Sequence, residues 1–157
     1  GKGEWDVNME QNRKGVFLVV KAVIPSMISR STGSIVFHGS ITGKRPLIHR
    51  SVYAASKIGM LGMVRTLAAE LGPHGVRANL ISPGYVDGSR LDWVIEQVAA
   101  IEGLTPEQMR VKWMESVPLG KFVQPEDTAQ GVPLQGCDRS SCITGIDLHR
   151  KGGRVTY

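Results

Sequence analysis

Three short apolar runs, each separated from the next by a segment long enough for a helix, constrain the fold more than any other feature. They are Ser34–His38, Val76–Ile81 and Ile143–Leu148, and apolar residues fall on both of their faces. Strands with two apolar faces are typical of a parallel sheet covered by helices on both sides. The alternation of helices and strands along the chain is typical of an α/β protein. We therefore predict the α/β class with parallel strands, although three strands make a small sheet for such a fold.

Helical periodicity fills the segments between these runs. Apolar residues recur every three or four positions over Trp5–Ser29, where Pro25 is expected to kink or stop the helix. A second apolar stripe predicts a helix over Ser51–Leu71. A third helical region is predicted over 90–117, with an interruption near Gly103 and a new start at a capping box on Thr105.

Composition limits the class of protein. The chain has 157 residues, of which 41% are hydrophobic and 21% charged, as expected for one globular domain over residues 1–157 rather than a disordered chain. No apolar run approaches the roughly 20 residues that span a membrane. The net charge of +5 is scattered and has no interleaved aromatic residues, so we expect no nucleic-acid surface. The two cysteines, Cys137 and Cys142, predict free thiols and a cytoplasmic protein.

Tyr53 and Lys57 form the strongest chemical signal. They lie four residues apart in a predicted helix, so their side chains share one face. A free tyrosine has a pKa of about 10, and a neighbouring ammonium group favours the phenolate, which makes such a tyrosine a usable general acid or base. Taken alone the pair is weak evidence, because tyrosine and lysine also occur at this spacing as ordinary surface pairs.

Residues at two strand ends strengthen this interpretation. Ser40 lies just after the first predicted strand, and Asn79 and Pro83-Gly84 mark the end of the second. In open α/β sheets, ligands bind at the edge formed by the carboxyl ends of the strands. The sequence therefore predicts an active site at this edge.

Taken together, these residues resemble the short-chain dehydrogenase/reductase family. The matching segments cover nearly the whole chain and are Asn12 with Gly15-Val16-Phe17, Gly33–Val36 leading to Ser40, Tyr53–Lys57, Asn79–Gly84, Pro125–Asp127, Ile143–Gly145 and Gly152-Gly153. No single segment is decisive, whereas their order and spacing are specific in combination. The resemblance implies the C-terminal portion of a Rossmann-type doubly wound parallel sheet.

The resemblance also implies a role for each catalytic residue. Tyr53 would be the general acid or base, and Lys57 would favour its anion and bind the nicotinamide ribose. Ser40 would hold the substrate oxygen, and Asn12 would bind a water that links Lys57 to bulk solvent. The alternative for Asn12 is an amide within a helix that caps nothing.

By the same resemblance, the cofactor would be NAD or NADP, and no metal is expected. The cofactor contacts would come from Tyr53, Lys57, Pro83, Gly84, Val86 and Ser89. Ser89 is included because the family places a threonine where this chain has Gly88.

A helical substrate lid is implied over residues 89–118. Within it, Trp93, Met109 and Trp113 are expected to pack in a core rather than contact substrate. Two later segments depart from the family pattern: the glycines and proline of 130–137 are expected to break the helix that Glu126 opens, and residues 149–151 are basic.

The family's glycine-rich phosphate loop has no counterpart in this sequence. We therefore interpret the chain as the C-terminal part of a longer enzyme that has on the order of 100 further residues. The expected activity is the interconversion of a secondary alcohol and a ketone, with a polyol or 3-oxoacyl substrate, in a homotetramer or homodimer. The alternative is a truncated, non-catalytic chain that binds full-length homologues as an assembly partner.

Overall fold

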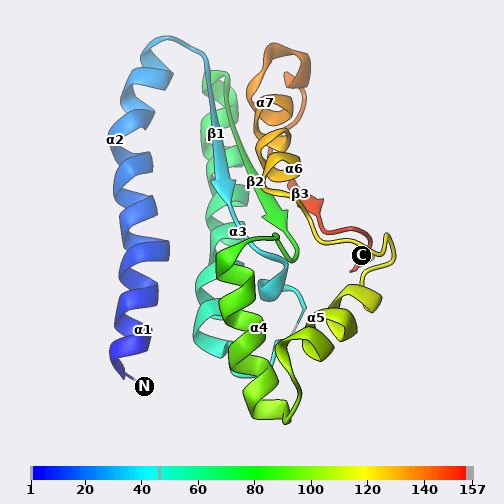
Figure 1. The fold of residues 1–157 in the computed structure, drawn as a ribbon. Coiled ribbons are helices and arrows are strands. Elements are labelled where there is room, and N and C mark those ends of the chain that lie inside the picture. The colour runs from blue at the N-terminus through cyan, green and yellow to red at the C-terminus, as the bar shows by residue number, and fades with distance from the viewer. Residues whose placement is uncertain (1, 46, 155–157) are drawn as a thin grey trace.

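A computed structural model describes residues 2–45 and 47–154 as three strands and a set of helices (Figure 1). The strands are β1 (Gly33–His38), β2 (Val76–Pro83) and β3 (Asp147–Arg150). They form one parallel sheet in the order β1-β2-β3, with Gly33 opposite Val76 and Leu80 opposite Asp147. The predicted α/β class with parallel strands is confirmed.

The helices cover both faces of this sheet. They are α1 (Lys2–Met9), α2 (Val16–Ser29), α3 (Ser51–Leu71), α4 (Ser89–Glu102), α5 (Pro106–Glu115), α6 (Pro125–Ala129) and α7 (Gly131–Gly136). In Figure 1, α3 lies behind the sheet and α7 in front of it, while α1 and α2 form one long rod beside β1. Buried side chains of α3, such as Val64, pack with Phe37 and Leu80 of the sheet into the main core.

The rod formed by α1 and α2 differs from the single regular helix predicted over Trp5–Ser29. A π-helical turn, Glu10–Gly15, joins its two halves. α2 contains Pro25 and ends at Ser29, which is the predicted end of the helix. Pro25 is exposed, and so is Lys21, whose carbonyl oxygen the missing N–H would have met, so no buried acceptor loses its donor.

The predicted interruption near Gly103 is confirmed, because α4 ends at Glu102 and α5 begins at Pro106. The capping box is present: Gln108 N donates to Thr105 Oγ1 over 3.2 Å, and Thr105 N donates to Gln108 Oε1 over 2.9 Å. Met109 and Trp113 are buried in a second core between α4 and α5, as predicted. The core prediction for Trp93 is wrong, because its side chain is 51% exposed.

The predicted strand over Ile143–Leu148 is also wrong in its position, since β3 begins at Asp147 and continues to Arg150. Gly145 has a φ of +73°, which interrupts the extended backbone. The preceding segment still bonds to β2, because Gly145 N donates to Ala78 O over 2.8 Å and Leu80 N donates to Ile146 O over 2.9 Å.

The predicted break over 130–137 is only a boundary between α6 and α7 at Gln130. Pro133 lies in the first turn of α7, where its missing N–H would have had no helical partner. Cys137 and Cys142 are free thiols, as expected. Among residues 2–45 and 47–154, no helix has the length and apolar character to cross a bilayer.

Candidate active site

The side chains of Tyr53 and Lys57 meet at the carboxyl end of β1. Both lie in the first two turns of α3, and Lys57 Nζ is 5.7 Å from the centroid of the Tyr53 ring. Lys57 Nζ also donates a hydrogen bond of 3.1 Å to the carbonyl oxygen of His38, the last residue of β1. The ammonium group is thereby held between the tyrosine ring and the end of the strand.

The surroundings of Lys57 disfavour its positive charge. Burial lowers the pKa of Lys57, and the nearby Arg90 guanidinium lowers it further. Burial also lowers the pKa of His38, and Lys57 adds to that effect. Two cations, Lys57 and Arg90, therefore lie near each other at the edge where a ligand is expected. The sequence analysis missed Arg90 and His38, and neither belongs to a recognisable motif.

Ser40 lies at the start of a short 3-10 turn, Ile41–Gly43. Its Oγ accepts a hydrogen bond of 3.2 Å from Thr42 N and donates one of 3.2 Å to Thr42 Oγ1. A Cβ on Gly43 would lie 2.9 Å from the backbone nitrogen of Ile58, so only glycine lets this turn pack so closely against α3. The turn that carries Ser40 is therefore seated on α3 next to Lys57.

Asn12 reaches the same helix by a route that the sequence did not reveal. It lies in the π-helical turn, and its Nδ2 donates to Ser56 Oγ over 3.4 Å. Ser56 is fully buried and its Oγ donates to the Tyr53 carbonyl oxygen over 2.8 Å. Asn12 is thus linked to the backbone of Tyr53 through Ser56. The one available signal for Ser56 was its position inside the Tyr53–Lys57 segment.

The remaining predicted residues follow the end of β2. Gly84 N donates to Arg150 O over 2.7 Å, and a Cβ on Gly84 would lie 3.0 Å from Lys151 Cα, so this turn rests on the end of β3. Val86 forms a parallel bridge with Val123, and Ser89 is the first residue of α4. Pro83 is buried, whereas Gly84, Val86 and Ser89 are half-buried or exposed and lie in the segment that connects the sheet edge to the lid.

Asn79 is structural and does not belong to the site. It is fully buried, its Nδ2 donates to Ile143 O over 2.8 Å, and its Oδ1 accepts from Ile146 N over 3.2 Å. These bonds hold the irregular segment before β3 against β2.

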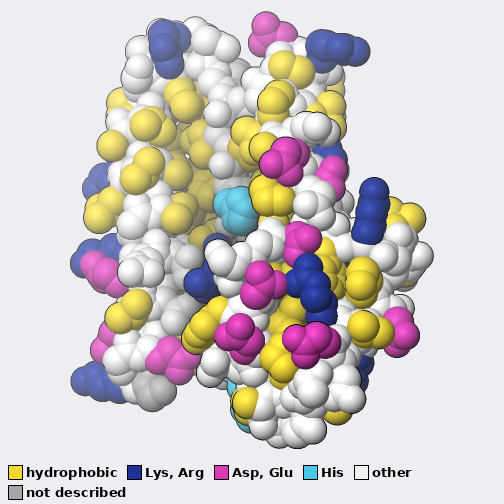
Figure 2. Space-filling model, viewed as in Figure 1, with side chains coloured by type: hydrophobic (Ala, Val, Ile, Leu, Met, Phe, Trp, Pro, Cys, Tyr) yellow, Lys and Arg dark blue, Asp and Glu magenta, His cyan; other side chains and the backbone are white. Residues whose placement is uncertain are grey.

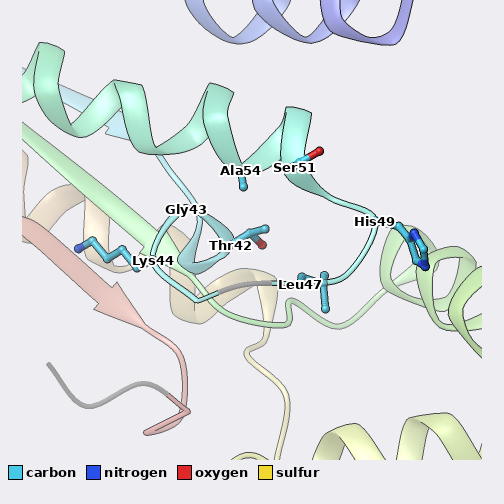
Figure 3. Close-up of a pocket in the computed structure, with 7 residues that line it drawn as sticks. All are labelled: Thr42, Gly43, Lys44, Leu47, His49, Ser51 and Ala54. Carbon is cyan, nitrogen blue, oxygen red and sulfur yellow. The ribbon is translucent and has the colours of Figure 1, made fainter. Parts of the chain in front are cut away.

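A pocket of about 340 Å³ opens between the Ser40 turn and the start of α3 (Figure 3). It is lined by Thr42, Gly43, Lys44, Leu47, His49, Ser51 and Ala54. Ser51 and Ala54 come from the same first turn of α3 as Tyr53, but Tyr53, Lys57 and Ser40 are not among the residues that line the pocket. Within the described part of the chain, no group of three or more His, Cys, Asp or Glu residues is arranged for a metal ion. The phenol of Tyr53 and the ammonium group of Lys57 lie together at the end of β1, with the Ser40 turn packed on the same helix, and this set of groups suits proton transfer to or from a ligand oxygen.

Comparison with known sequences finds similar proteins along nearly the whole chain. The family model described as enoyl-(acyl carrier protein) reductase matches residues 2–154. The 3-oxoacyl-[acyl-carrier-protein] reductase FabG of Thermotoga maritima is 35% identical over 152 residues, which are 97% of this chain and 57% of the relative. The chain thus spans little more than half the length of this curated relative.

Solved structures share the fold. Sorbitol-6-phosphate 2-dehydrogenase from Erwinia amylovora superposes with a TM-score of 0.94 at 25% identity, covering 99% of this chain and 61% of that one. A variant of actinorhodin polyketide ketoreductase with NADPH gives 0.88 at 32% identity, covering 93% and 57%. A 3-oxoacyl-[acyl-carrier protein] reductase with bound NAD from Brucella melitensis gives 0.84 at 26% identity, covering 99% and 54%.

Proposed function

The chain belongs to the short-chain dehydrogenase/reductase family, and we propose that it carries the catalytic half of an oxidoreductase that interconverts a secondary alcohol and a ketone. The observation that carries the proposal is the placement of Lys57, which is tied to the end of β1 beside the Tyr53 ring. The Ser40 turn packs against the same helix, so a proton donor, a cation and a hydroxyl group surround one edge of the sheet.

In the reducing direction, the Tyr53 hydroxyl gives its proton to the carbonyl oxygen of the substrate. Lys57 stabilises the resulting phenolate, and the Ser40 hydroxyl orients the substrate oxygen. Ser56 and Asn12 hold the backbone of Tyr53, so they position the phenol without touching substrate. In the oxidising direction the Tyr53 phenolate takes the proton back.

The residues present fit the nicotinamide half of NAD or NADP, which supplies or accepts the hydride when bound. Lys57 and Arg90 place two cations together, which suits a cofactor that carries phosphate groups. Lys57 and Tyr53 would hold the ribose, the turn at Pro83 and Gly84 together with Val86 would face the nicotinamide, and the Ser89 hydroxyl would bind its carboxamide. NADPH and NAD accompany two of the solved structures compared above.

A 3-oxoacyl or polyol substrate is supported by the relatives, which include a 3-oxoacyl reductase and a sorbitol-6-phosphate dehydrogenase. The α4–α5 hairpin would be the lid over this substrate, because Tyr85 of the Gly84 turn stacks on Trp113 of α5 at 4.4 Å between ring centroids. The two thiols favour a reducing compartment, and we place the protein in the cytoplasm.

A second candidate function is assembly with other chains. Hydrophobic side chains lie exposed along α2, on the rod at the left of Figure 2, and they include Phe17, Leu18, Val19 and Val23. Apolar surface of this extent on a helix favours contact with another protein surface. It supports a homotetramer or homodimer of the enzyme, and it equally suits a non-catalytic chain that binds full-length homologues.

The test uses the full-length polypeptide that contains this segment, with acetoacetyl-CoA and sorbitol 6-phosphate as substrates and NAD(P)H absorbance as the readout. Tyr53→Phe is expected to lower kcat at least about 100-fold, because proton transfer is lost, while the Kd for NAD(P)H rises far less, because Lys57 still holds the ribose. Lys57→Ala is expected to weaken both. Arg65→Ala, which removes an exposed cation of α3 to which no role is assigned, is the matched control and should change neither. Turnover by the Tyr53→Phe variant near the level of the unsubstituted protein would overturn the proposed role.

A further inference from the structure

A second pocket, of about 340 Å³, lies where β3 ends, beside the loop that leads from α5 to α6. Most of the ionisable side chains that line it are basic, and the full set is Lys121, Asp127, His149, Arg150 and Lys151. Residues 149–151 are the basic segment in which the sequence departs from the pattern of the family it resembles. The proposed reaction uses none of these side chains, so the positive charge of this pocket has no role in it.

Arg150 is a cation whose position is fixed but whose charge is not compensated. Its side chain is half-buried, and a Cβ on Gly131 would lie 3.4 Å from its Nε, so the side chain rests on the start of α7. Its carbonyl oxygen accepts a hydrogen bond of 2.7 Å from Gly84 N, which holds the backbone beneath it. Among residues 2–45 and 47–154, the guanidinium has no hydrogen bond and no ion pair.

Lys121 is a second cation of this kind. It is exposed and comes from the loop before α6, which is tied to the pocket because Leu119 N donates to Gly152 O over 3.1 Å. Its ammonium group likewise has no ion pair within the described part of the chain. Asp127 is the one carboxylate among the described residues that line the pocket, and its Oδ2 accepts from Gln124 N over 3.0 Å. One carboxylate therefore faces more than one cation.

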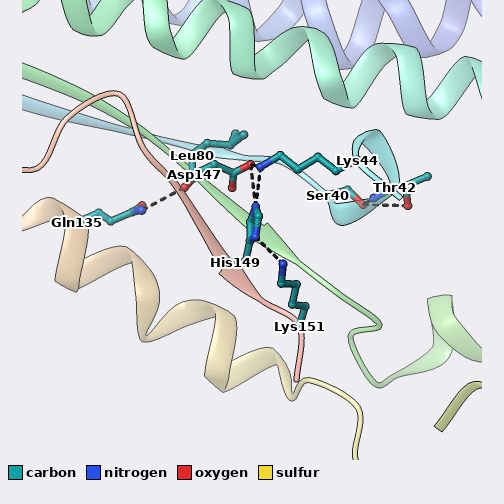
Figure 4. Close-up of polar contacts among 8 residues, drawn as sticks. All are labelled: Ser40, Thr42, Lys44, Leu80, Gln135, Asp147, His149 and Lys151. Carbon is teal, nitrogen blue, oxygen red and sulfur yellow. Dashed lines mark hydrogen bonds and ion pairs between the residues drawn. The ribbon is translucent and has the colours of Figure 1, made fainter. Parts of the chain in front are cut away.

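The polar network beside the pocket does not supply the missing negative charge (Figure 4). Lys44 Nζ lies 2.6 Å from Asp147 Oδ2, so this carboxylate, which is only 5% exposed, already has a cation. His149 Nε2 lies 2.6 Å from Lys44 Nζ and 3.4 Å from Asp147 Oδ2. Its Nδ1 lies 2.7 Å from Lys151 Nζ. With two lysines and one carboxylate, the network has no net negative charge in either protonation state of His149.

We propose that this pocket binds a phosphate dianion, either inorganic phosphate or the phosphate group of an organic ester. A guanidinium presents N–H donors in a planar fork that matches two phosphate oxygens, and lysines add compact positive charges. Arg150 makes the forked contact, and Lys121 adds a second charge from the neighbouring loop. The two charges of a phosphate match the two cations that lack a counter-ion, whereas a carboxylate would compensate only one of them.

A bound phosphate would act close to the candidate active site. Arg150 O accepts from Gly84 N, and a Cβ on Gly84 would lie 3.0 Å from Lys151 Cα. The pocket and the turn that is proposed to face the nicotinamide therefore share one stretch of backbone. The proposal itself rests on the charges of the pocket and does not depend on the oxidoreductase function.

The test measures phosphate binding by isothermal titration calorimetry at constant ionic strength and about pH 8, where phosphate groups carry two charges. It uses the full-length polypeptide that contains this segment, and only binding that depends on Arg150 counts. Arg150→Gln is expected to weaken this binding at least about tenfold, as for the loss of hydrogen bonds between charged groups. Arg139→Gln, which removes an exposed arginine charge outside the pocket, is the matched control and should leave it unchanged.

Asp127→Asn provides a test in the opposite direction. It removes the repelling carboxylate but keeps an oxygen that can accept from Gln124 N, so α6 retains its start. Phosphate binding is expected to tighten roughly threefold, the size of one charge–charge interaction in a wet pocket. A variant that merely unfolds would not give this result.

Methyl phosphate separates the two sources of the anion. Binding at least as tight as that of inorganic phosphate, with the same dependence on Arg150, assigns the pocket to a phosphate ester, and much weaker binding assigns it to the free anion. Undetectable binding of both probes at millimolar concentration would overturn the proposal. Equal weakening by Arg139→Gln and Arg150→Gln would also overturn it, because the attraction would then come from the general positive charge of the surface.

Discussion

Gly39 offers the sharpest test of how this site is packed. It lies between β1 and Ser40, is buried, and its N donates to Ile81 O over 2.8 Å. A Cβ on Gly39 would lie 2.7 Å from Ser82 Oγ and 3.1 Å from both Leu80 Cδ atoms. These approaches are several tenths of an ångström too close, and overpacking of this kind costs about 1–3 kcal/mol. We therefore predict that Gly39→Ala lowers the free energy of unfolding by about 2 kcal/mol in urea denaturation.

Ser82 provides the matched control, because its Oγ has no hydrogen-bond partner among residues 2–45 and 47–154. Ser82→Ala alone should change stability by less than about 1 kcal/mol, since no hydrogen bond is lost. In the double variant the closest clash disappears, and the pair should recover at least about 1 kcal/mol of the Gly39→Ala loss. Additive effects, within about 0.5 kcal/mol, would refute the reasoning that steric contact with Ser82 determines the cost.

Three further predictions test other parts of the structure. Arg90→Gln removes a positive charge near Lys57, so the pKa of Lys57 should rise, although burial should keep it below its ordinary value. NMR titration of isotopically dimethylated lysines measures this pKa. An unchanged or lower pKa of Lys57 would contradict the proximity of the two cations. Asn79→Ala leaves the Ile143 C=O and the Ile146 N–H without partners. We expect the free energy of unfolding in urea to fall by about 2–4 kcal/mol. A loss below about 1 kcal/mol would count against the structural role of Asn79. Thr105→Ala removes the cap of α5 and should cost about 1 kcal/mol, measured as a lower Tm, whereas Thr105→Ser should retain most of it.

Local signals account for the parts of the fold that the sequence predicted. The capping box at Thr105 needs only residues three apart, and the helix over Ser51–Leu71 needs only an apolar stripe, so both were predicted correctly. The position of β3 was not, because Ile143 and Ile146 look like strand residues in sequence. Their backbone is instead held by Asn79, a long-range partner that no local pattern identifies.

The candidate site was predictable to a different extent. The spacing of Tyr53 and Lys57 correctly placed both side chains on one face of α3. The contact from Lys57 to the His38 carbonyl could not be predicted, because it depends on how β1 meets the helix in space. The link from Asn12 through Ser56 depends on a π-helical turn, which has no sequence signature of its own.

Irregular backbone and tight packing concentrate around these same residues. The π-helical turn carries Asn12, glycines at 39 and 43 admit close contacts on both sides of Ser40, and Gly88 has a φ of +133° just before Ser89. Each feature departs from the most stable local arrangement, and a chain selected for stability alone would not retain them together. All of these features lie at the carboxyl edge of the sheet. This is expected if they are retained, despite the lost stability, because they place Tyr53, Lys57 and Ser40 correctly. The Gly39→Ala and Ser82→Ala pair tests this directly, because restored stability without restored turnover would show that the position of Ser40, rather than the strength of the fold, requires glycine.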